Sequence, residues 1–210
     1  MVNEAFNDDG TWREDIWYNV TGTSYIPTAF AAAEKAVKDN NLNVKLYYND
    51  YNIEYLGNKS ISAQNLVKDL KNRGIQIDGV GLQSHFIVGG TPSTASQVAN
   101  MQAFTALGVD VAVTELDIRT TTPPTASAQQ QQVLDYASTT AACAQVEGCV
   151  GITVWDFDDT YSWIPQTFAG QGYGDLFFQP AGANTPLVRK AAYDGVIDGF
   201  TGVVPTLASS

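Results

Sequence analysis

The sequence predicts an α/β protein of the (β/α)8 TIM-barrel class, of which the 210 residues hold about the last five strand–helix units. Two observations support this class. Short runs rich in Val and Ile alternate with longer segments of helical periodicity, which is typical of a parallel sheet with helical crossovers. Each unit takes about 42 residues, so eight units of that size fall within the known range of such barrels.

Five short segments are predicted as strands. Runs of this length that are apolar on both faces suit strands buried in a parallel sheet. The predicted strands are a stub over 1–6, followed by 43–48, 77–83, 109–116 and 150–157. A complete doubly wound domain of five strands is the alternative architecture. Neither GxGxxG nor GxxxxGK[ST] follows any of these segments, so that alternative lacks its usual nucleotide-binding signature.

Helical periodicity lies between the predicted strands. Ile26, Phe30, Ala33 and Val37 fall on one helix face. Three further helices are expected over 60–74, 98–107 and 126–146, the first with Ile61, Leu66, Val67 and Leu70 inward. A last helix is expected to begin with Thr185 as N-cap and Pro186 at N1, with Leu187, Val188 and Ala191 inward. Gly74 and Gly108 stand where a helix C′ residue is expected.

Composition and charge exclude several partners. The net charge of −11 repels phosphate backbones and anionic membranes, so we expect neither nucleic acid nor a membrane as a partner. A neutral polysaccharide is compatible with that charge. The single histidine lies far in sequence from the two cysteines, and zinc prefers about four ligands, so no metal and no cofactor is predicted.

Cys143 and Cys149 are separated by five residues, and a local disulfide is the simplest interpretation, with two reduced core cysteines as the alternative. A disulfide favours an oxidising compartment. Asn19 (N-V-T) and Asn58 (N-K-S) begin sequons for N-glycosylation, which point in the same direction. No basic and apolar leader follows Met1, so a signal peptide is not visible in this chain.

Polar or aromatic residues follow every predicted strand. In barrels of this class the reactive groups gather at the carboxyl ends of the strands. Five such ends together predict a site for a hydroxyl-rich ligand. The residues at these ends are Asn3 and Glu4, Asn49, Asp50 and Tyr51, Gln83 and His85, Glu115 and Asp117, and Trp155, Asp156 and Asp158, with Trp163 beyond them.

Two of these residues, Glu4 and Glu115, suit glycoside hydrolysis. That reaction needs two carboxyl groups beside the glycosidic bond, one a general acid with a raised pKa and the other ionised. Their strands are three positions apart, so in an eight-stranded barrel the two side chains can face each other across the mouth. Either glutamate alone is as well explained as a solvated loop residue.

The segments "VNEAF", "LQSH", "VTELDI", "YYNDYN" and "ITVWDFDDTYSW" together resemble glycoside hydrolase family 10, the endo-1,4-β-xylanases. The resemblance runs from Val2 to about Gly202, so we expect residues 1–202 to form part of a catalytic domain and 203–210 to form a flexible tail. It implies endo-hydrolysis of β-1,4-xylosidic bonds in xylan, and a secreted enzyme of fungal type.

The resemblance also implies roles for individual residues. Glu4 is implied as the acid/base and Glu115 as the nucleophile of a retaining double displacement, with their carboxyl groups about 5–5.5 Å apart. Asp117 is implied to orient His85, and a carboxylate partner would fix a neutral imidazole with one donor and one acceptor nitrogen. The implied substrate-binding residues are Asn3, Asn49, Tyr51, Gln83, His85, Trp155 and Trp163, the two indoles stacking on xylose rings.

The sequence departs from the family at its front, where the first three strand–helix units have no counterpart. We expect these units to belong to a longer protein, with Met1 as the start of a partial reading frame or a replacement. Without them apolar surface is bared, so the isolated chain is expected to associate and to have little activity. The alternative functions are a non-catalytic fragment or sugar-binding protein, and a cellulase-type β-1,4-glycosidase on the same fold.

Overall fold

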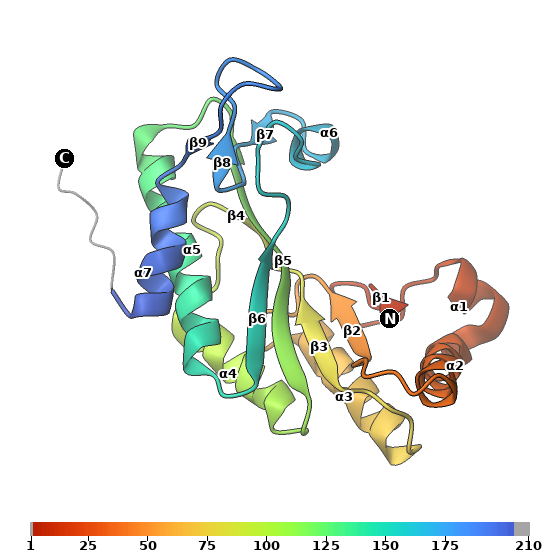
Figure 1. The fold of residues 1–210 in the computed structure, drawn as a ribbon. Helices are drawn as coiled ribbons and strands as arrows, with labels where there is room; N and C mark the ends of the chain where they lie inside the picture. Colours follow the sequence, from red (N-terminus) through yellow and green to blue (C-terminus); the bar gives the residue numbers. More distant parts are fainter. Residues whose placement is uncertain (1, 204–210) are drawn as a thin grey trace.

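Five parallel strands form the centre of the structure, a computed structural model that describes residues 2–203. Their hydrogen-bonded order is β1, β2, β3, β5 and β6, and the sheet runs across Figure 1 in this order from right to left. The strands are β1 (Val2–Asn3), β2 (Tyr47–Asp50), β3 (Gly79–Leu82), β5 (Asp110–Thr121) and β6 (Cys149–Val154). Each predicted strand segment therefore overlaps one of the observed strands, although β2 ends two residues beyond the predicted 43–48 and β5 ends five residues beyond the predicted 109–116.

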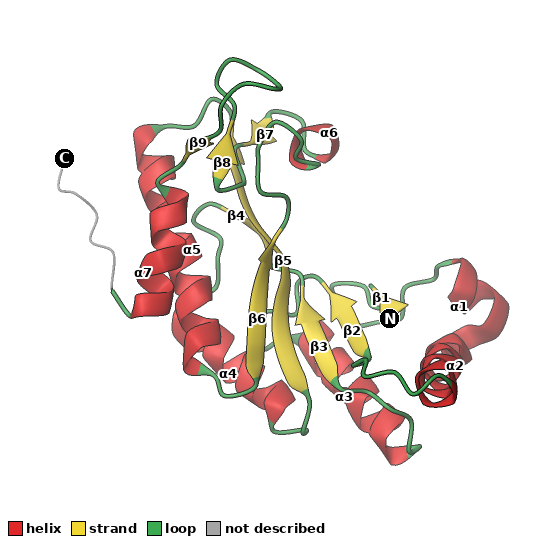
Figure 2. Ribbon diagram, viewed as in Figure 1, coloured by secondary structure: helices red, strands yellow, loops and turns green. Residues whose placement is uncertain are grey.

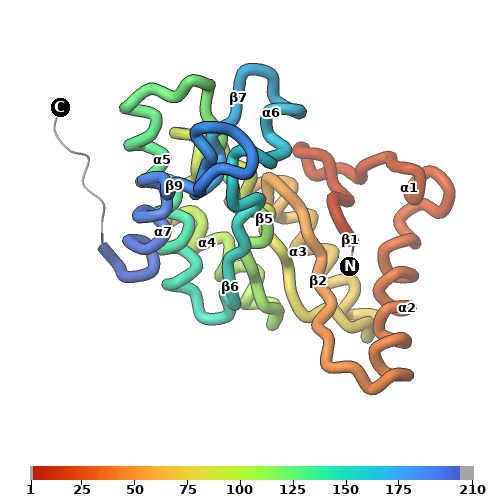
Figure 3. The backbone as a smooth tube through the Cα atoms, turned by 45° about the horizontal axis from the view of Figure 1, so that its top comes forward, coloured from red at the N-terminus to blue at the C-terminus, as the bar shows by residue number. Residues whose placement is uncertain are grey.

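Helices connect and cover these strands (Figure 2). The helices are α1 (Ile16–Thr21), the short 3-10 turn η1 (Gly22–Ser24), α2 (Tyr25–Asp39), α3 (Asn58–Asn72), α4 (Thr94–Thr105), α5 (Ala126–Gln145), α6 (Ile164–Thr167) and α7 (Ala192–Thr201). In Figures 1 and 3, α1 and α2 lie beyond β1 at one end of the sheet, and α5 and α7 lie beyond β6 at the other.

Local chemistry explains where several helices begin and end. The Ser93 and Thr125 hydroxyl oxygens accept the backbone N–H groups of Ser96 and Ala128, which caps α4 and α5. Gly74 and Gly108 follow α3 and α4 with φ of 70° and 71°. A left-handed backbone of this kind is easy for glycine. Gly74 stands at the C′ position that the sequence predicts, whereas Gly108 comes one residue after the C′ position of α4.

The prediction for the last helix was wrong. Val188–Arg189 forms β9, which pairs antiparallel with β8 (Phe177–Phe178), and α7 begins only at Ala192. The buried Lys190 Nζ lies 2.7 Å from an Asp159 oxygen, which fixes the segment just before the helix. These long-range contacts override the local N-cap and proline pattern. Two further short strands, β4 (His85–Ile87) and β7 (Gln171–Gly172), pair with the long β5.

The core lies between the middle strands and the helices that cover them. All four residues of β3 are buried, and Ile26 and Phe30 of α2 are buried as predicted. Ile61 was expected to face inward with Leu66 and Leu70, but its side chain is 49% exposed. The α3 stripe is therefore narrower than the sequence suggested, because Ile61 lies on the solvent side of the helix.

Strand β6 is less buried than its apolar sequence predicted. Val150 is 58% exposed, and none of the six residues of β6 is fully buried. Within residues 2–203, β6 pairs only with β5, so one of its edges and part of one face have no neighbour. A run of β-branched residues indicates a strand, but its burial depends on what packs beside it.

The predicted disulfide is confirmed, since Cys143 in α5 is bonded to Cys149 at the start of β6. No helix among the described residues is long and apolar enough to cross a membrane. The predicted tail falls largely on 204–210, which lie outside the described residues, as does Met1.

Candidate active site

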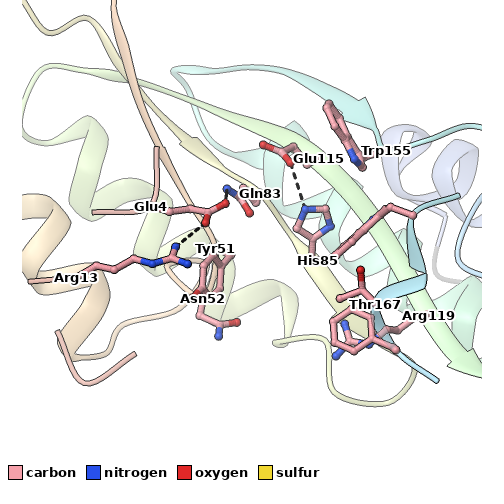
Figure 4. A pocket seen from close by; sticks show the side chains of 12 residues that line it. Glu4, Arg13, Tyr51, Asn52, Gln83, His85, Glu115, Arg119, Trp155 and Thr167 are labelled. Carbon is pink, nitrogen blue, oxygen red and sulfur yellow. Dashed lines mark hydrogen bonds and ion pairs between the residues drawn. The ribbon is translucent and has the colours of Figure 1, made fainter. Parts of the chain in front are cut away.

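A cavity of about 610 Å³ opens at the carboxyl ends of the parallel strands (Figure 4). Seven of the rim residues that the sequence singled out line it, together with five residues from neighbouring segments, whereas Asn3, Asn49, Asp50, Asp117, Asp156 and Asp158 are not part of the lining. The lining residues are Glu4, Arg13, Tyr51, Asn52, Gln83, His85, Glu115, Arg119, Trp155, Trp163, Thr167 and Phe168. Residues from opposite ends of the chain therefore share one hollow, as the order of the strands predicts.

Glu4 follows β1 in an unusual backbone conformation. Its φ is 55°, in the left-handed region that residues other than glycine seldom adopt. Its backbone N–H donates to the Asn49 carbonyl, and the next N–H, of Ala5, donates to the hydroxyl of buried Tyr48. These two bonds hold the turn that aims the Glu4 carboxylate into the cavity.

The direction of the pKa shift of Glu4 differs from the expectation for a general acid. Burial raises its pKa, but hydrogen bonds from Gln83 and Arg13, together with the charge of Arg13, outweigh burial and leave the pKa below its ordinary value. The Arg13 guanidinium lies 2.7 Å from Glu4 Oε2 (Figure 4). The raised pKa predicted for the acid is therefore absent here, because this ion pair favours the carboxylate.

An amide network connects the two glutamates. Asn49 Nδ2 donates to Glu115 Oε1 at 2.7 Å and to Asn3 Oδ1 at 2.8 Å. Asn3 Nδ2 and Gln83 Nε2 each donate to Glu4 Oε1 at 3.0 Å. Three amide side chains on neighbouring strands thus fix both carboxylates in one hydrogen-bonded row.

Gly81 makes room for this network. A Cβ atom at Gly81 would lie 2.2 Å from Asn49 Oδ1 and 2.8 Å from the Thr114 methyl carbon, so only glycine fits between them. Thr114 Oγ1 donates to the same Asn49 oxygen at 2.6 Å, which leaves the Asn49 amide nitrogen to face Glu115. The orientation of Asn49 is therefore set by residues of β3 and β5.

Glu115 belongs to a second chain of polar contacts. Its Oε2 lies 3.2 Å from His85 Nε2, and His85 Nδ1 lies 2.8 Å from Asp117 Oδ2. Trp163 Nε1 donates to that same Asp117 oxygen at 2.7 Å. The contact between Asp117 and His85 that the sequence predicted is present.

Both nitrogens of His85 lie within hydrogen-bond reach of a carboxylate, Nδ1 of Asp117 and Nε2 of Glu115. Burial lowers the pKa of His85, but the hydrogen bonds and charges of Asp117 and Glu115 outweigh burial and raise it. Burial raises the pKa of Asp117, although His85 and Trp163 oppose the rise.

Aromatic side chains form the walls of the cavity. Trp155 follows β6 with 43% of its surface exposed, and Trp163 packs its ring edge-to-face with His85 at 4.8 Å between centroids. The Tyr51 ring lies under the ammonium group of buried Lys59, 3.3 Å from the ring centroid. Flat apolar faces beside polar groups suit the faces and hydroxyls of a sugar.

Sequence reasoning missed several groups at or below the cavity. Arg13 comes from the loop after β1, and Arg119 lies with its guanidinium carbon 4.0 Å from the Phe168 ring centroid. The buried Glu54 follows β2. Arg119 stands four residues after Glu115 on the same strand, so its place on the same face as Glu115 could have been predicted from the sequence. The place of Arg13 depends on a loop path that no periodicity encodes.

The sequon residues lie away from this cavity. Asn19 is exposed in α1, and its Nδ2 donates to the Glu14 carbonyl at 3.2 Å. Asn58 is exposed at the first position of α3, while Ser60 of its sequon is buried against Asn100. Both asparagines remain candidates for N-glycosylation.

Comparison with known proteins identifies relatives of this chain. The sequence profile of glycosyl hydrolase family 10 matches residues 1–198. Endo-1,4-beta-xylanase D of Talaromyces funiculosus is 57% identical over 200 residues, which are 95% of this chain and 47% of the relative. Endo-1,4-beta-xylanase A of Phanerodontia chrysosporium is 51% identical over 95% of this chain and 46% of its own length. The chain spans about half the length of these curated relatives.

Solved structures show the same fold. The GH10 xylanase from Bispora sp. MEY-1, solved with xylobiose, has a TM-score of 0.93 and 66% identity, over 94% of this chain and 60% of that one. Xylanase 10B from Thermotoga maritima has a TM-score of 0.85 at 32% identity, over 97% of this chain and 60% of that one. The five parallel strands therefore correspond to part of a (β/α)8 barrel.

Proposed function

Because this chain belongs to glycosyl hydrolase family 10, we propose that its cavity hydrolyses internal β-1,4-xylosidic bonds of xylan with retention of configuration. The observation that carries the proposal is the pair of carboxylates, Glu4 and Glu115, held in one cavity by the amides of Asn3, Asn49 and Gln83. Two carboxyl groups beside one glycosidic bond are the requirement of this reaction.

In the proposed first step, an oxygen of Glu115 attacks the anomeric carbon, and Glu4 gives a proton to the departing glycosidic oxygen. This breaks the bond to the leaving sugar and leaves a glycosyl ester on Glu115. In the second step Glu4 takes a proton from water, whose oxygen displaces Glu115 from the anomeric carbon. The retaining geometry implies carboxyl groups about 5–5.5 Å apart.

The ion pair between Arg13 and Glu4 must be reconciled with the proton that Glu4 has to deliver. The Arg13 side chain is 44% exposed, so its guanidinium can move away from Glu4 when a sugar enters. We propose that the leaving-group sugar displaces Arg13, which removes the contact that lowers the pKa of Glu4. Closure of the site around substrate would raise that pKa further by desolvation.

The other cavity residues fit sugar recognition. We propose that Asn3 bonds the 2-hydroxyl at the cleavage point and that Gln83, Asn49 and His85 surround the same sugar. Tyr51, Trp155 and Trp163 would supply flat surfaces for neighbouring rings. Asp117 would act as a positioning residue that holds His85, because it contacts the imidazole and is itself buried outside the cavity lining.

The test is release of reducing ends from β-1,4-xylan by the purified chain. Activity in the parent and its loss in Glu115→Ala support the proposal, and Glu147→Ala, at an exposed carboxylate in the turn after α5, serves as a matched control. Binding of xylan by the parent with no release of reducing ends would favour the sugar-binding alternative. Release from a β-1,4-glucan in place of xylan would favour the cellulase alternative.

The disulfide bears on where the protein works. Disulfides persist in oxidising compartments and are rare in the cytosol. The bond between Cys143 and Cys149 therefore supports the proposal that the protein is secreted, in agreement with the two exposed sequon asparagines.

A further inference from the structure

A buried glutamate outside the cavity lining holds the segment that carries two cavity residues. Glu54 lies in the loop after β2, with only 2% of its surface exposed. Its Oε1 accepts the backbone N–H of Ser84 at 2.6 Å. Ser84 is fully buried and stands between Gln83 and His85, both of which line the cavity.

The backbone at Ser84 needs such support. Its φ is 64°, a left-handed conformation that is costly for serine and persists only where the surroundings impose it. Gln83, just before it, is tied on both sides, because its N–H donates to the Asp50 carbonyl and its carbonyl accepts from the Glu115 N–H. His85, just after it, starts β4 in register with Asp117. Glu54 thus holds the peptide where the chain turns from one strand to the next.

The loop that carries Glu54 is itself anchored. Asn100 of α4 donates from Nδ2 to the Ile53 carbonyl at 2.7 Å, and the Asn100 oxygen accepts from Ser60 of α3 at 2.5 Å. Both of these side chains are fully buried. A hydrogen-bonded path therefore runs from two helices through residues 53 and 54 to the turn beside the cavity.

We propose that Glu54 is a positioning residue. The length of its side chain fixes the Gln83–His85 turn and thereby places His85 between Glu115 and Asp117. The Glu54 carboxylate accepts its hydrogen bond from the Ser84 backbone, so it acts on Gln83 and His85 through Ser84, with a weaker electrostatic interaction with His85 itself. The functional consequence rests on the proposed glycosidase function, whereas the placement of His85 does not. The two can therefore be tested apart.

His85 is a clean reporter because it is the single histidine of the chain. Its imidazole resonances can be titrated by NMR without ambiguity of assignment. Glu54→Gln keeps the length and an acceptor oxygen but removes the charge, whereas Glu54→Asp keeps the charge but is one methylene too short for Ser84. We expect the raised pKa of His85 to persist in Glu54→Gln and to fall toward the ordinary histidine value in Glu54→Asp.

A control and a second readout keep the test decisive. Asp78 accepts the Leu46 N–H at 2.6 Å at the opposite end of β3, so Asp78→Ala loses a comparable contact and should leave the His85 titration unchanged. A His85 pKa that falls in Glu54→Gln but not in Glu54→Asp, or that changes in neither variant, would overturn the proposal. If Glu54→Asp does not fold, hydrogen exchange of the Ser84 amide provides the test. We expect slow exchange at Ser84 in the parent and in Glu54→Gln. Fast exchange at Ser84 in the folded parent would overturn the proposal.

Discussion

Replacing Asp175 by Asn should stabilise the protein, and more so as the pH rises. Asp175 is fully buried, and neither of its carboxylate oxygens has a hydrogen-bond partner among residues 2–203. Burial, together with the nearby charges of Asp159 and Asp117, raises its pKa from 3.8 to about 8, although Lys190 opposes the rise. An isosteric amide carries no charge and therefore avoids the cost of ionisation in this place.

The magnitude and its sign follow from proton linkage. Between pH 4 and 8 the folded state keeps the Asp175 proton that the unfolded chain has lost, so the stability of the parent falls as the pH rises through this window. Each tenfold change in proton affinity is worth about 1.4 kcal/mol. The cost is therefore close to zero near pH 4, about 3 kcal/mol near pH 6 and about 6 kcal/mol above pH 8, and Asp175→Asn should recover it.

Urea unfolding at pH 4, 6 and 8.5 measures this difference, with Glu147→Gln as a control at an exposed carboxylate. We expect the midpoints of parent and Asp175→Asn to coincide at pH 4 and to separate steadily as the pH rises. The control should follow the parent at every pH. A stability difference between parent and Asp175→Asn that is the same at all three pH values would refute the reasoning.

Three further outcomes are expected. Arg13→Gln removes the ion pair that lowers the pKa of Glu4, so that pKa should rise in a carbon-13 titration of the carboxyl, and an unchanged value would contradict the assigned cause. Replacing Cys143 and Cys149 by Ser opens a loop with a sequence separation of 6 and should lower the free energy of unfolding by about 2 kcal/mol. Urea titration measures this loss, and an unchanged unfolding midpoint would count against it. Trp17 is 64% exposed beside an apolar hollow, so the chain should associate and elute from size exclusion above its monomer mass. Trp17→Ser should reduce the apparent mass, and a parent that elutes as a monomer would disprove this expectation.

The positions of the two glutamates could be predicted because they depend on the shortest-range rules. Glu4 directly follows β1, and Glu115 lies within β5 two residues beyond its last pair with β3, so both stand at the carboxyl edge of the central sheet. Gln83 and Trp155 follow from the same rule. The strand segments and the cavity residues Glu4, Gln83, Glu115 and Trp155 were thus accessible from local patterns, whereas their implied roles came from the resemblance to the family.

The remaining features depend on contacts between distant segments. The ion pair of Lys190 and Asp159 joins residues 31 positions apart and moves the start of the last helix, which its local sequence placed too early. The low pKa of Glu4 depends on the path of the loop that brings Arg13 back. Burial of β6 depends on neighbours that a single strand's sequence does not describe. Each of these outcomes is decided by tertiary packing, which overrides local preference.

The central claim is that Glu115 attacks the sugar and forms a covalent intermediate. The most direct measurement is the intact mass of the chain after incubation with a 2-fluoro-xylobioside that carries a good leaving group, followed by peptide mapping. We expect a single added 2-fluoro-xylobiosyl unit on the peptide that holds Glu115, and no addition in Glu115→Ala. A chain that releases the leaving group without ever gaining mass, or that is labelled on Glu4, would contradict it.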